Sequence, residues 1–373
     1  MLPIVIGSLW LLAIVFLVIV YLKSRFTLLN YQAPVPSIES KSIPIEGVSI
    51  IICAHNELKN LQRLLPKLYD QDYPNYEIVV VCDRSSDGTF DFLLEQKAAY
   101  NKLKVVWVRH RPPHIKGKKY ALTLGIKAAT HDILLLTDAD CLPTSCKWVS
   151  TMSKAFTENV QIILGYSPYQ ANSGILNAYV RYDTLHTAGL YFSAALAGRP
   201  FMGVGRNLAY RKSWFMGKNG FAGITHIVGG DDDLLVNNYA TSANTEVSFG
   251  YESHMVSLPK QSWKQLYRQK KRHLSVGKYY NNRDKVWLGS LSLANLVFWI
   301  GWIGLTLAGY EPIFIATGLI LKWISQFFFL RTTANTLKDP LNLALLPILD
   351  FLYVIYYVLL GISAISSKNT QWN

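Results

Sequence analysis

The chain has 373 residues, of which 50% are hydrophobic, 13% aromatic and only 16% charged. This composition is too apolar for an ordinary soluble enzyme and too charged for membrane helices alone, and the length allows roughly two or three domains. The formal net charge of +13 fits nucleic acid, an anionic substrate or a membrane surface as partner, and the position of the charges has to decide between them.

Residues 1–25 are predicted to form a transmembrane anchor. The stretch 3–22 carries no charge, and about 20 apolar residues suffice to cross a bilayer. A cleaved signal peptide is the alternative, but Lys23 and Arg25 follow the apolar run instead of preceding it. The positive-inside rule then places the chain from Lys23 onward in the cytoplasm.

Residues 288–366 are expected to add about three more membrane helices. Their apolar runs cover 288–310, 312–330 and 341–365. Lys322 and Asp350 lie inside these runs and are expected to face other helices or an interface. The sequence therefore predicts an integral membrane protein whose middle domain is cytoplasmic, and this layout favours a bacterial inner membrane.

Residues 45–255 alternate short apolar runs with helical patterns. Strands are expected at 47–54, 76–83, 103–108 and 132–138, and helices at 57–71, 87–100 and 118–130. Near-continuous apolar strands that alternate with helices indicate an α/β domain, in which a mostly parallel sheet is covered on both faces. In such sheets ligands bind at the carboxyl ends of the strands.

Acidic side chains follow three of these strands. Glu57 comes shortly after the first, Asp83 ends the second, and Asp138 and Asp140 end the fourth. Residues i and i+2 of an extended chain point to the same side, so Asp138 and Asp140 can face one position. Two carboxylates in one position favour a hard divalent cation, Mg2+ or Mn2+, completed by waters and substrate phosphates. The alternative is a helix N-cap, and Pro143 is expected to open the following helix.

Three consecutive aspartates, Asp231–Asp233, follow a Gly-Gly pair and precede an apolar helical pattern. A helix N-terminus favours acidic residues through its macrodipole, which explains one or two of them. Three adjacent carboxylates favour a further role, with one of them acting as a general base.

Residues 258–285 are basic and aromatic and are expected to form an amphipathic helix region in the membrane interface. Much of the positive charge lies here, so nucleic acid is not needed as a partner. Gln269, Arg272 and His273 have the spacing of one helical face, for which a solvent-exposed face is the alternative.

Two glycine-containing segments fail to match known nucleotide loops. In and just before the segment IKGKKYAL, Pro112 and Lys119 stand where a phosphate loop needs glycine and a hydroxyl. The segment GVGRNL at 203–208 lacks the third glycine of a dinucleotide fingerprint, which weighs against a dehydrogenase.

Over about residues 45–285 the motifs resemble membrane-bound members of glycosyltransferase family 2, the relatives of cellulose and hyaluronan synthases. The segment VSIIICAHNE resembles the family's VSIIIPAxNE, with Cys53 for proline, and VVVCDRSSDGT resembles VVDDGSxDGT. The segment GKKYALTLG resembles GKxxALNxG, DAD matches the DxD motif, and GVGRNLAYRK resembles the acceptor-site segment. The segment DDDLL resembles EDxxL, and QKKRH resembles QxxRW with His273 for tryptophan.

The resemblance implies the GT-A fold, a Rossmann-like nucleotide-sugar domain joined here to transmembrane helices. It implies Asp232 as the catalytic base, Asp138 and Asp140 as metal ligands, and an acceptor side at Gly205, Asp231 and His273. The residues that it places at the nucleotide sugar are Ala54, Asn56, Glu57, Asp83, Lys118, Asp138, Gln269 and Arg272.

The activity implied is that of an inverting glycosyltransferase. The donor would be a nucleotide sugar, UDP-linked in preference to GDP-linked, and the acceptor a lipid-linked or polysaccharide glycan at the membrane, in cell-surface glycan biosynthesis. The alternative is a polyprenyl-phosphate glycosyltransferase, in which a phosphate acceptor makes a base less necessary. A different class is a transporter or scaffold with a degenerate nucleotide-binding domain, which would be expected to lose some of Asp138, Asp140 and Lys118.

Overall fold

The computed structural model describes residues 2–31 and 46–366, and the chain divides into two compact units that alternate along the sequence. Of the described residues, the helical unit takes 2–31, 171–194 and 260–366, and the α/β unit takes 46–170 and 195–259. Each unit is therefore discontinuous in sequence.

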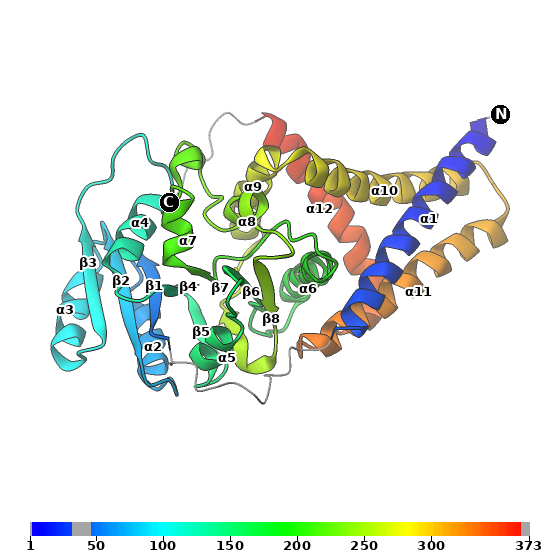
Figure 1. The fold of residues 1–373 in the computed structure, drawn as a ribbon. Helices are drawn as coiled ribbons and strands as arrows, with labels where there is room; N and C mark the ends of the chain where they lie inside the picture. Colours follow the sequence, from blue (N-terminus) through cyan, green and yellow to red (C-terminus); the bar gives the residue numbers. More distant parts are fainter. Residues whose placement is uncertain (1, 32–45, 367–373) are drawn as a thin grey trace. The chain divides into compact units, whose positions relative to one another are not determined.

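The α/β unit is built on a seven-stranded sheet with the strand order β3-β2-β1-β4-β7-β6-β8 (Figure 1). The strands are β1 (Val48–Ala54), β2 (Tyr76–Asp83), β3 (Leu103–Val108), β4 (Ile133–Asp138), β6 (Ile162–Gly165), β7 (Leu208–Arg211) and β8 (Thr245–Ser248). All neighbours pair in parallel except β7, which runs antiparallel to β4 and β6. The prediction of a mostly parallel sheet is confirmed.

A second, two-stranded sheet joins β5 (Cys141–Pro143) to β9 (Met255–Ser257). Pro143 pairs with Met255 there, and the next helix begins only at Trp148. The expectation that Pro143 opens a helix is therefore wrong. An edge strand tolerates proline because it needs no N–H donor on its outer side.

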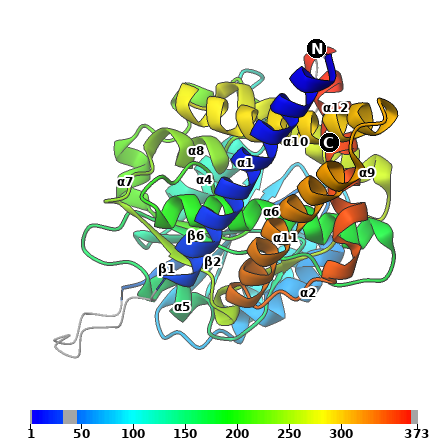
Figure 2. The ribbon, with the colours of Figure 1, turned by 90° about the vertical axis from the view of Figure 1, so that its right-hand side faces the viewer.

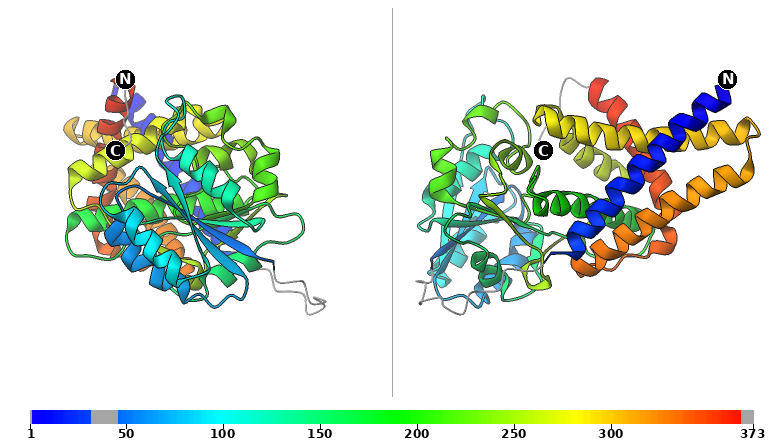
Figure 3. Two further views of the ribbon diagram at one scale, coloured as in Figure 1. Left: turned by 90° about the vertical axis from the view of Figure 1, so that its left-hand side faces the viewer. Right: turned by 45° about the vertical axis from the view of Figure 1, so that its right-hand side comes forward.

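Helices cover both faces of the large sheet (Figure 3). Those of the α/β unit are α2 (Leu58–Tyr69), α3 (Thr89–Ala99), α4 (Lys119–Ala128), α5 (Trp148–Lys154), α7 (Lys212–Gly217) and α8 (Asp233–Tyr239), with short 3-10 turns at Ala222–Ile224 and Tyr251–Ser253. Leucines of α2 pack with alternate residues of β1, such as Ile50, on one face, while Ala121 of α4 packs with Val81 on the other. This alternation follows from the two-residue period of strands.

Within residues 2–31 and 46–366, the helical unit holds four helices that are long and apolar enough to cross a membrane. They are α1 (Leu2–Leu29), α10 (Asn282–Leu307), α11 (Pro312–Thr336) and α12 (Leu346–Ser366). Figure 2 shows α1 lying beside α11. Trp10 of α1 donates its indole N–H to the Phe298 carbonyl at 2.8 Å, and a side chain at Gly301 or Gly318 would collide with the Trp10 ring. The two glycines thus let helices α10 and α11 approach α1 closely.

The charged residues near the middle of α11 and α12 are buried and form an ion pair. Lys322 of α11 forms an ion pair with Asp350 of α12, and Gln326 donates to the same carboxylate at 3.1 Å. This arrangement agrees with the expectation that Lys322 and Asp350 face other helices, because an unpaired charge in an apolar span is costly.

The structure also groups residues 171–194 with the membrane helices, whereas the sequence pattern treats 45–255 as one stretch. These residues form most of α6 (Ile175–Leu196), whose Asp183 pairs with Lys270 and accepts a hydrogen bond from Tyr357 at 2.9 Å. Lys270 belongs to α9 (Trp263–Val276). The helical unit also contains two short 3-10 turns, Gly277–Tyr279 and Leu343–Leu345. The elements expected from the sequence include no helix at α6, so both this helix and the unit it packs in are findings of the structure.

Candidate functional site

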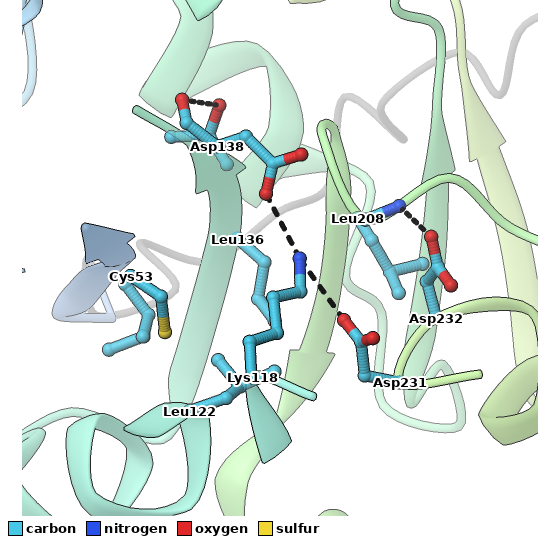
Figure 4. A pocket seen from close by; sticks show the side chains of 11 residues that line it. Cys53, Lys118, Leu122, Leu136, Asp138, Leu208, Asp231 and Asp232 are labelled. Atoms are coloured by element: carbon cyan, nitrogen blue, oxygen red, sulfur yellow. Dashed lines mark hydrogen bonds and ion pairs between the residues drawn. The ribbon is translucent and has the colours of Figure 1, made fainter. Parts of the chain in front are cut away.

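A pocket opens at the carboxyl ends of β1 and β4 within the α/β unit (Figure 4). It is lined by Ile51, Cys53, Lys118, Leu122, Leu136, Thr137, Asp138, Gly205, Leu208, Asp231 and Asp232. Its walls therefore come from the parallel strands β1 and β4, the start of α4, the start of β7 with the turn before it, and the loop before α8. This is the edge at which a parallel sheet binds its ligands.

Lys118 stands in the middle of this pocket. Its Nζ lies 2.9 Å from Oδ1 of Asp138 and 3.1 Å from Oδ2 of Asp231, as the dashed lines in Figure 4 show. Burial by itself would lower the pKa of Lys118, but these two carboxylates and Asp232 raise it well above its usual range. The lysine therefore stays protonated and links the end of β4 to the Asp231–Asp233 run.

Asp232 is oriented by two backbone amides. Its Oδ2 accepts from the N–H of Gly205 at 2.7 Å, and its Oδ1 accepts from the N–H of Asp233 at 2.8 Å. The second bond makes Asp232 the N-cap of α8, so the capping interpretation holds for this residue while its carboxylate also lines the pocket. A Cβ at Gly205 would lie 3.0 Å from Oδ2, so this close approach suits glycine.

The charge state of Asp232 is set by its surroundings. Burial and then the negative charge of Asp231 raise the pKa of Asp232 above the ordinary 3.8, although Lys118 and the two amides act in the opposite direction. A carboxylate whose pKa is raised is a better proton acceptor near neutral pH than an ordinary aspartate.

Asp138 and Asp140 flank the buried Ala139 and are both partly exposed. Among residues 2–31 and 46–366 no group of three or more His, Cys, Asp or Glu side chains could hold a metal ion. Two carboxylates are a donor set that suits Mg2+ or Mn2+, because these ions take further ligands from water and substrate phosphates. The residues present therefore fit a metal site that the donor completes.

Cys53 lines the pocket as a neutral thiol. Burial is the main reason why the pKa of Cys53 rises to about 12, with the aspartates around it adding to the effect. A thiol in this state is a poor nucleophile at neutral pH. The site thus offers no sign of covalent catalysis by cysteine.

The residues after β1 and β2 that are predicted to contact the nucleotide sugar lie in two loops, and hydrogen bonds connect these loops. Asn56, at φ 57°, accepts from the Ser86 N–H at 2.8 Å, and the Glu57 N–H donates to the Thr89 hydroxyl at 3.2 Å. Ala54 is fully buried. Asp83 is buried too and pairs with Arg84, whose Nε lies 2.7 Å from Oδ1, a partner that the sequence reasoning missed.

Gln269, Arg272 and His273 all lie on α9, in the helical unit, whereas the pocket belongs to the α/β unit. Gln269 and Arg272 are partly buried and His273 is exposed. Gln269 and Arg272 are thus less exposed than a fully solvated helix face would be, and their role stays a prediction.

Sequence reasoning also missed two cations near the pocket. Arg206 directly follows Gly205, and its guanidinium lies 4.4 Å from the centre of the Tyr169 ring. Burial alone would lower the pKa of Arg206, but Tyr169, Cys141, Asp140 and Asp138 raise it. Lys119, next to Lys118, is fully buried against the loop before the three aspartates. The sequence signal for a second, buried lysine was the pair of adjacent lysines at the start of a helix, because only one of the two can face the pocket.

Part of the chain matches a known protein family. Residues 49–216 match the model of Glycosyl transferase family 2. The chain is 31% identical over 103 residues to a poly-beta-1,6-N-acetyl-D-glucosamine synthase of Staphylococcus epidermidis. The aligned region covers 28% of this chain and 24% of that protein. The chain thus spans about a quarter of the length of this curated relative.

Two further similarities extend over more of the chain. Over 218 residues the chain is 26% identical to a dolichyl N-acetyl-alpha-D-glucosaminyl phosphate 3-beta-D-2,3-diacetamido-2,3-dideoxy-beta-D-glucuronosyltransferase of Methanococcus voltae. This alignment covers 56% of this chain and 61% of that protein. The mannosyltransferase PcManGT of Pyrobaculum calidifontis, solved with GDP-Man and Mn2+, superimposes with a TM-score of 0.62 at 20% identity, over 90% of this chain and 99% of that one. The last similarity shows that the fold is GT-A.

Proposed function

Since the chain belongs to glycosyl transferase family 2 through residues 49–216, we propose that it is an inverting glycosyltransferase of the membrane. It would move a sugar from a nucleotide-sugar donor to an acceptor hydroxyl. The observation that carries the proposal is the pocket, in which Lys118 bridges Asp138 of the DxD motif and Asp231, the neighbour of Asp232. Donor-binding and acceptor-activating groups are thereby held within one site.

The donor diphosphate would bind at the end of β4. Asp138 and Asp140 would hold Mg2+ or Mn2+, which when bound offsets the negative charge that develops on the leaving diphosphate. The structure of PcManGT in complex with Mn2+ supports this metal class. Lys118 adds a positive charge beside Asp138, and the resemblance to QxxRW adds Gln269 and Arg272 as hydrogen-bond donors to the same phosphates.

Asp232 would act as the general base. Its carboxylate takes the proton of the acceptor hydroxyl while that oxygen attacks the anomeric carbon and the bond from the sugar to the diphosphate breaks. The Gly205 and Asp233 amides hold the carboxylate in place during this single displacement, and each carboxylate oxygen keeps a lone pair for the proton. The configuration at the anomeric carbon is inverted because the attack comes from the side opposite the leaving group.

A UDP-sugar remains the favoured donor and a lipid-linked or polysaccharide glycan the favoured acceptor. The four candidate spans and the glycan chemistry in the names of the two curated relatives support a membrane-associated glycan acceptor. The location proposed from the chain layout is a bacterial inner membrane. Lys23 and Arg25 after the first span support an orientation with the α/β unit in the cytoplasm.

The direct test is a donor screen on membranes that contain the protein. UDP- and GDP-sugars are supplied one at a time, and released UDP or GDP is measured against membranes with the Asp232→Asn variant. We expect release with at least one UDP-sugar and none above the variant with GDP-sugars. Release with GDP-sugars alone would overturn the donor class. No release with any donor, and no donor binding by calorimetry, would favour the transporter or scaffold alternative.

The pH profile tests the environment of Asp232. Since its pKa lies above the ordinary 3.8, activity is expected to fall on acidification at a higher pH than an ordinary aspartate would give, as the base becomes protonated. The Asp231→Asn variant removes the neighbouring negative charge, which lowers the pKa of Asp232 and moves this acid limb to lower pH. The measurement is kcat/KM against pH, with Asp91→Asn on the exposed surface of α3 as the control. An acid limb that does not move in Asp231→Asn would contradict the prediction.

A further inference from the structure

Lys119 is a buried lysine for which the proposed mechanism has no use. Its side chain is 1% exposed, and its Nζ donates to the carbonyl oxygen of Ile227 at 2.6 Å and to that of Gly229. Burying an ammonium group is costly unless it is fully hydrogen-bonded. An apolar residue would fill this place at lower cost, so the two carbonyl contacts point to a specific task.

Both carbonyls belong to the loop that leads to Asp231 and Asp232. Gly229 and Gly230 in this loop have φ values of +88° and +79°, and a Cβ at Gly230 would lie 2.5 Å from the Leu234 side chain. Consecutive glycines have little conformational preference of their own. Contacts from outside the loop therefore help to fix its path at these two glycines.

Those contacts come from the segment around the start of α4. The backbone N–H of Lys116 donates to the Thr225 carbonyl at 2.8 Å, and Lys119 follows with its two bonds to the same loop. Lys118, between them, contacts the Asp231 carboxylate at 3.1 Å. One short segment thus binds the backbone of the loop and also its first carboxylate.

The surroundings of Lys118 and Lys119 differ in the same way as their contacts. Burial lowers the pKa of Lys119 below its ordinary 10.5, although Asp231, Asp232 and Asp233 act in the opposite direction. Lys118 faces the pocket, where a donor would meet it, but Lys119 lies outside the set of residues that line the pocket. A defect at Lys119 should consequently leave donor contacts in place and disturb the loop.

We propose that Lys119 is a positioning residue, which fixes the 227–231 backbone and thereby sets Asp232 against the acceptor hydroxyl. The inference rests on the proposed function for its catalytic consequence, while the contact of Lys119 with the loop stands independently of it. Of the two adjacent lysines, Lys118 is then the residue that lines the pocket and Lys119 the residue that holds the loop.

The test compares Lys119→Met with Lys116→Met, an exposed lysine of the same segment whose hydrogen bond to Thr225 uses only its backbone. In Lys119→Met, kcat is expected to fall about 10²-fold, the cost of displacing a catalytic group by about 1 Å, with the donor KM nearly unchanged. Lys119→Arg, which keeps hydrogen-bond donors, should recover part of the loss. Lys116→Met should match the wild type.

Hydrogen exchange gives a readout that does not require activity. The amides of Gly205 and Asp233, which donate to Asp232, are expected to exchange faster in Lys119→Met, while β1 amides such as that of Ile50 keep their protection. An unchanged kcat, or a loss of protection in β1 equal to that at Gly205, would overturn the positioning role. If the wild type transfers no sugar, faster exchange at Gly205 still supports the loop contact and the failure falls on the proposed function alone.

Discussion

The Asp232→Asn variant is expected to lose sugar transfer by a factor of about 10²–10⁴, the range that general base catalysis contributes. Asparagine has the same shape, and its side-chain oxygen can still accept a backbone hydrogen bond from Gly205 or Asp233. It cannot take the proton of the acceptor hydroxyl. The measurement is kcat with a UDP-sugar found in the donor screen, together with the donor Kd from calorimetry, which should stay close to that of the wild type.

Asp233→Asn is the matched control, because this neighbour also accepts a backbone amide, that of Leu234 at 2.8 Å, but lies outside the pocket. Its effect should be small. Near-full transfer by Asp232→Asn with normal donor binding would show that the base assignment is wrong. That result would favour the polyprenyl-phosphate alternative, since a phosphate acceptor is already ionised and needs no base.

Removal of divalent cations is expected to abolish transfer. Stabilisation of the departing diphosphate by a metal contributes several kcal/mol, which corresponds to a rate loss of about 10²-fold or more. Membranes treated with EDTA should be inactive and should recover with Mn2+ or Mg2+. The Asp140→Asn variant should need a higher metal concentration for half-maximal activity, because one of two carboxylate ligands is lost.

A comparison of the two DxD variants sharpens this prediction. Asp138→Asn removes a metal ligand and also the partner of Lys118 at 2.9 Å, so it should lower thermal stability as well as metal affinity. Asp140→Asn should change metal affinity with little effect on stability. Equal activity in EDTA and in Mn2+ would exclude the metal role of both residues.

The parts of the fold that follow from the sequence are those with long apolar runs. The predicted strands at 76–83 and 103–108 coincide with β2 and β3, because six to eight consecutive residues that are mostly apolar leave few other structures. By contrast, β6, β7 and β8 have four residues each, too few for a periodic pattern. The antiparallel direction of β7 depends on tertiary pairing, which no local pattern encodes.

The site divides in the same way. Strand polarity alone brings Asp138 and the loops after β1 and β2 to one edge of the sheet, so these positions could be predicted. The pairing of Lys118 with both Asp138 and Asp231 joins segments far apart in the sequence and appears only in three dimensions. Arg84 also pairs with its neighbour Asp83, and the left-handed backbone of Arg84 at φ 55° is not indicated by the sequence pattern.

The course of the chain through α6 has a consequence for any attempt to divide the protein. Removal of residues 1–31 and 260–366 would leave α6 inside the remaining fragment, between the strands β6 and β7. Tyr182 would then lose Gln326, Asp183 would lose Lys270 and Tyr357, and the His186 ring would lose its packing against Phe329 and Tyr353. Neither a terminal truncation nor an exchange of anchors between relatives therefore separates the α/β unit cleanly from the membrane helices.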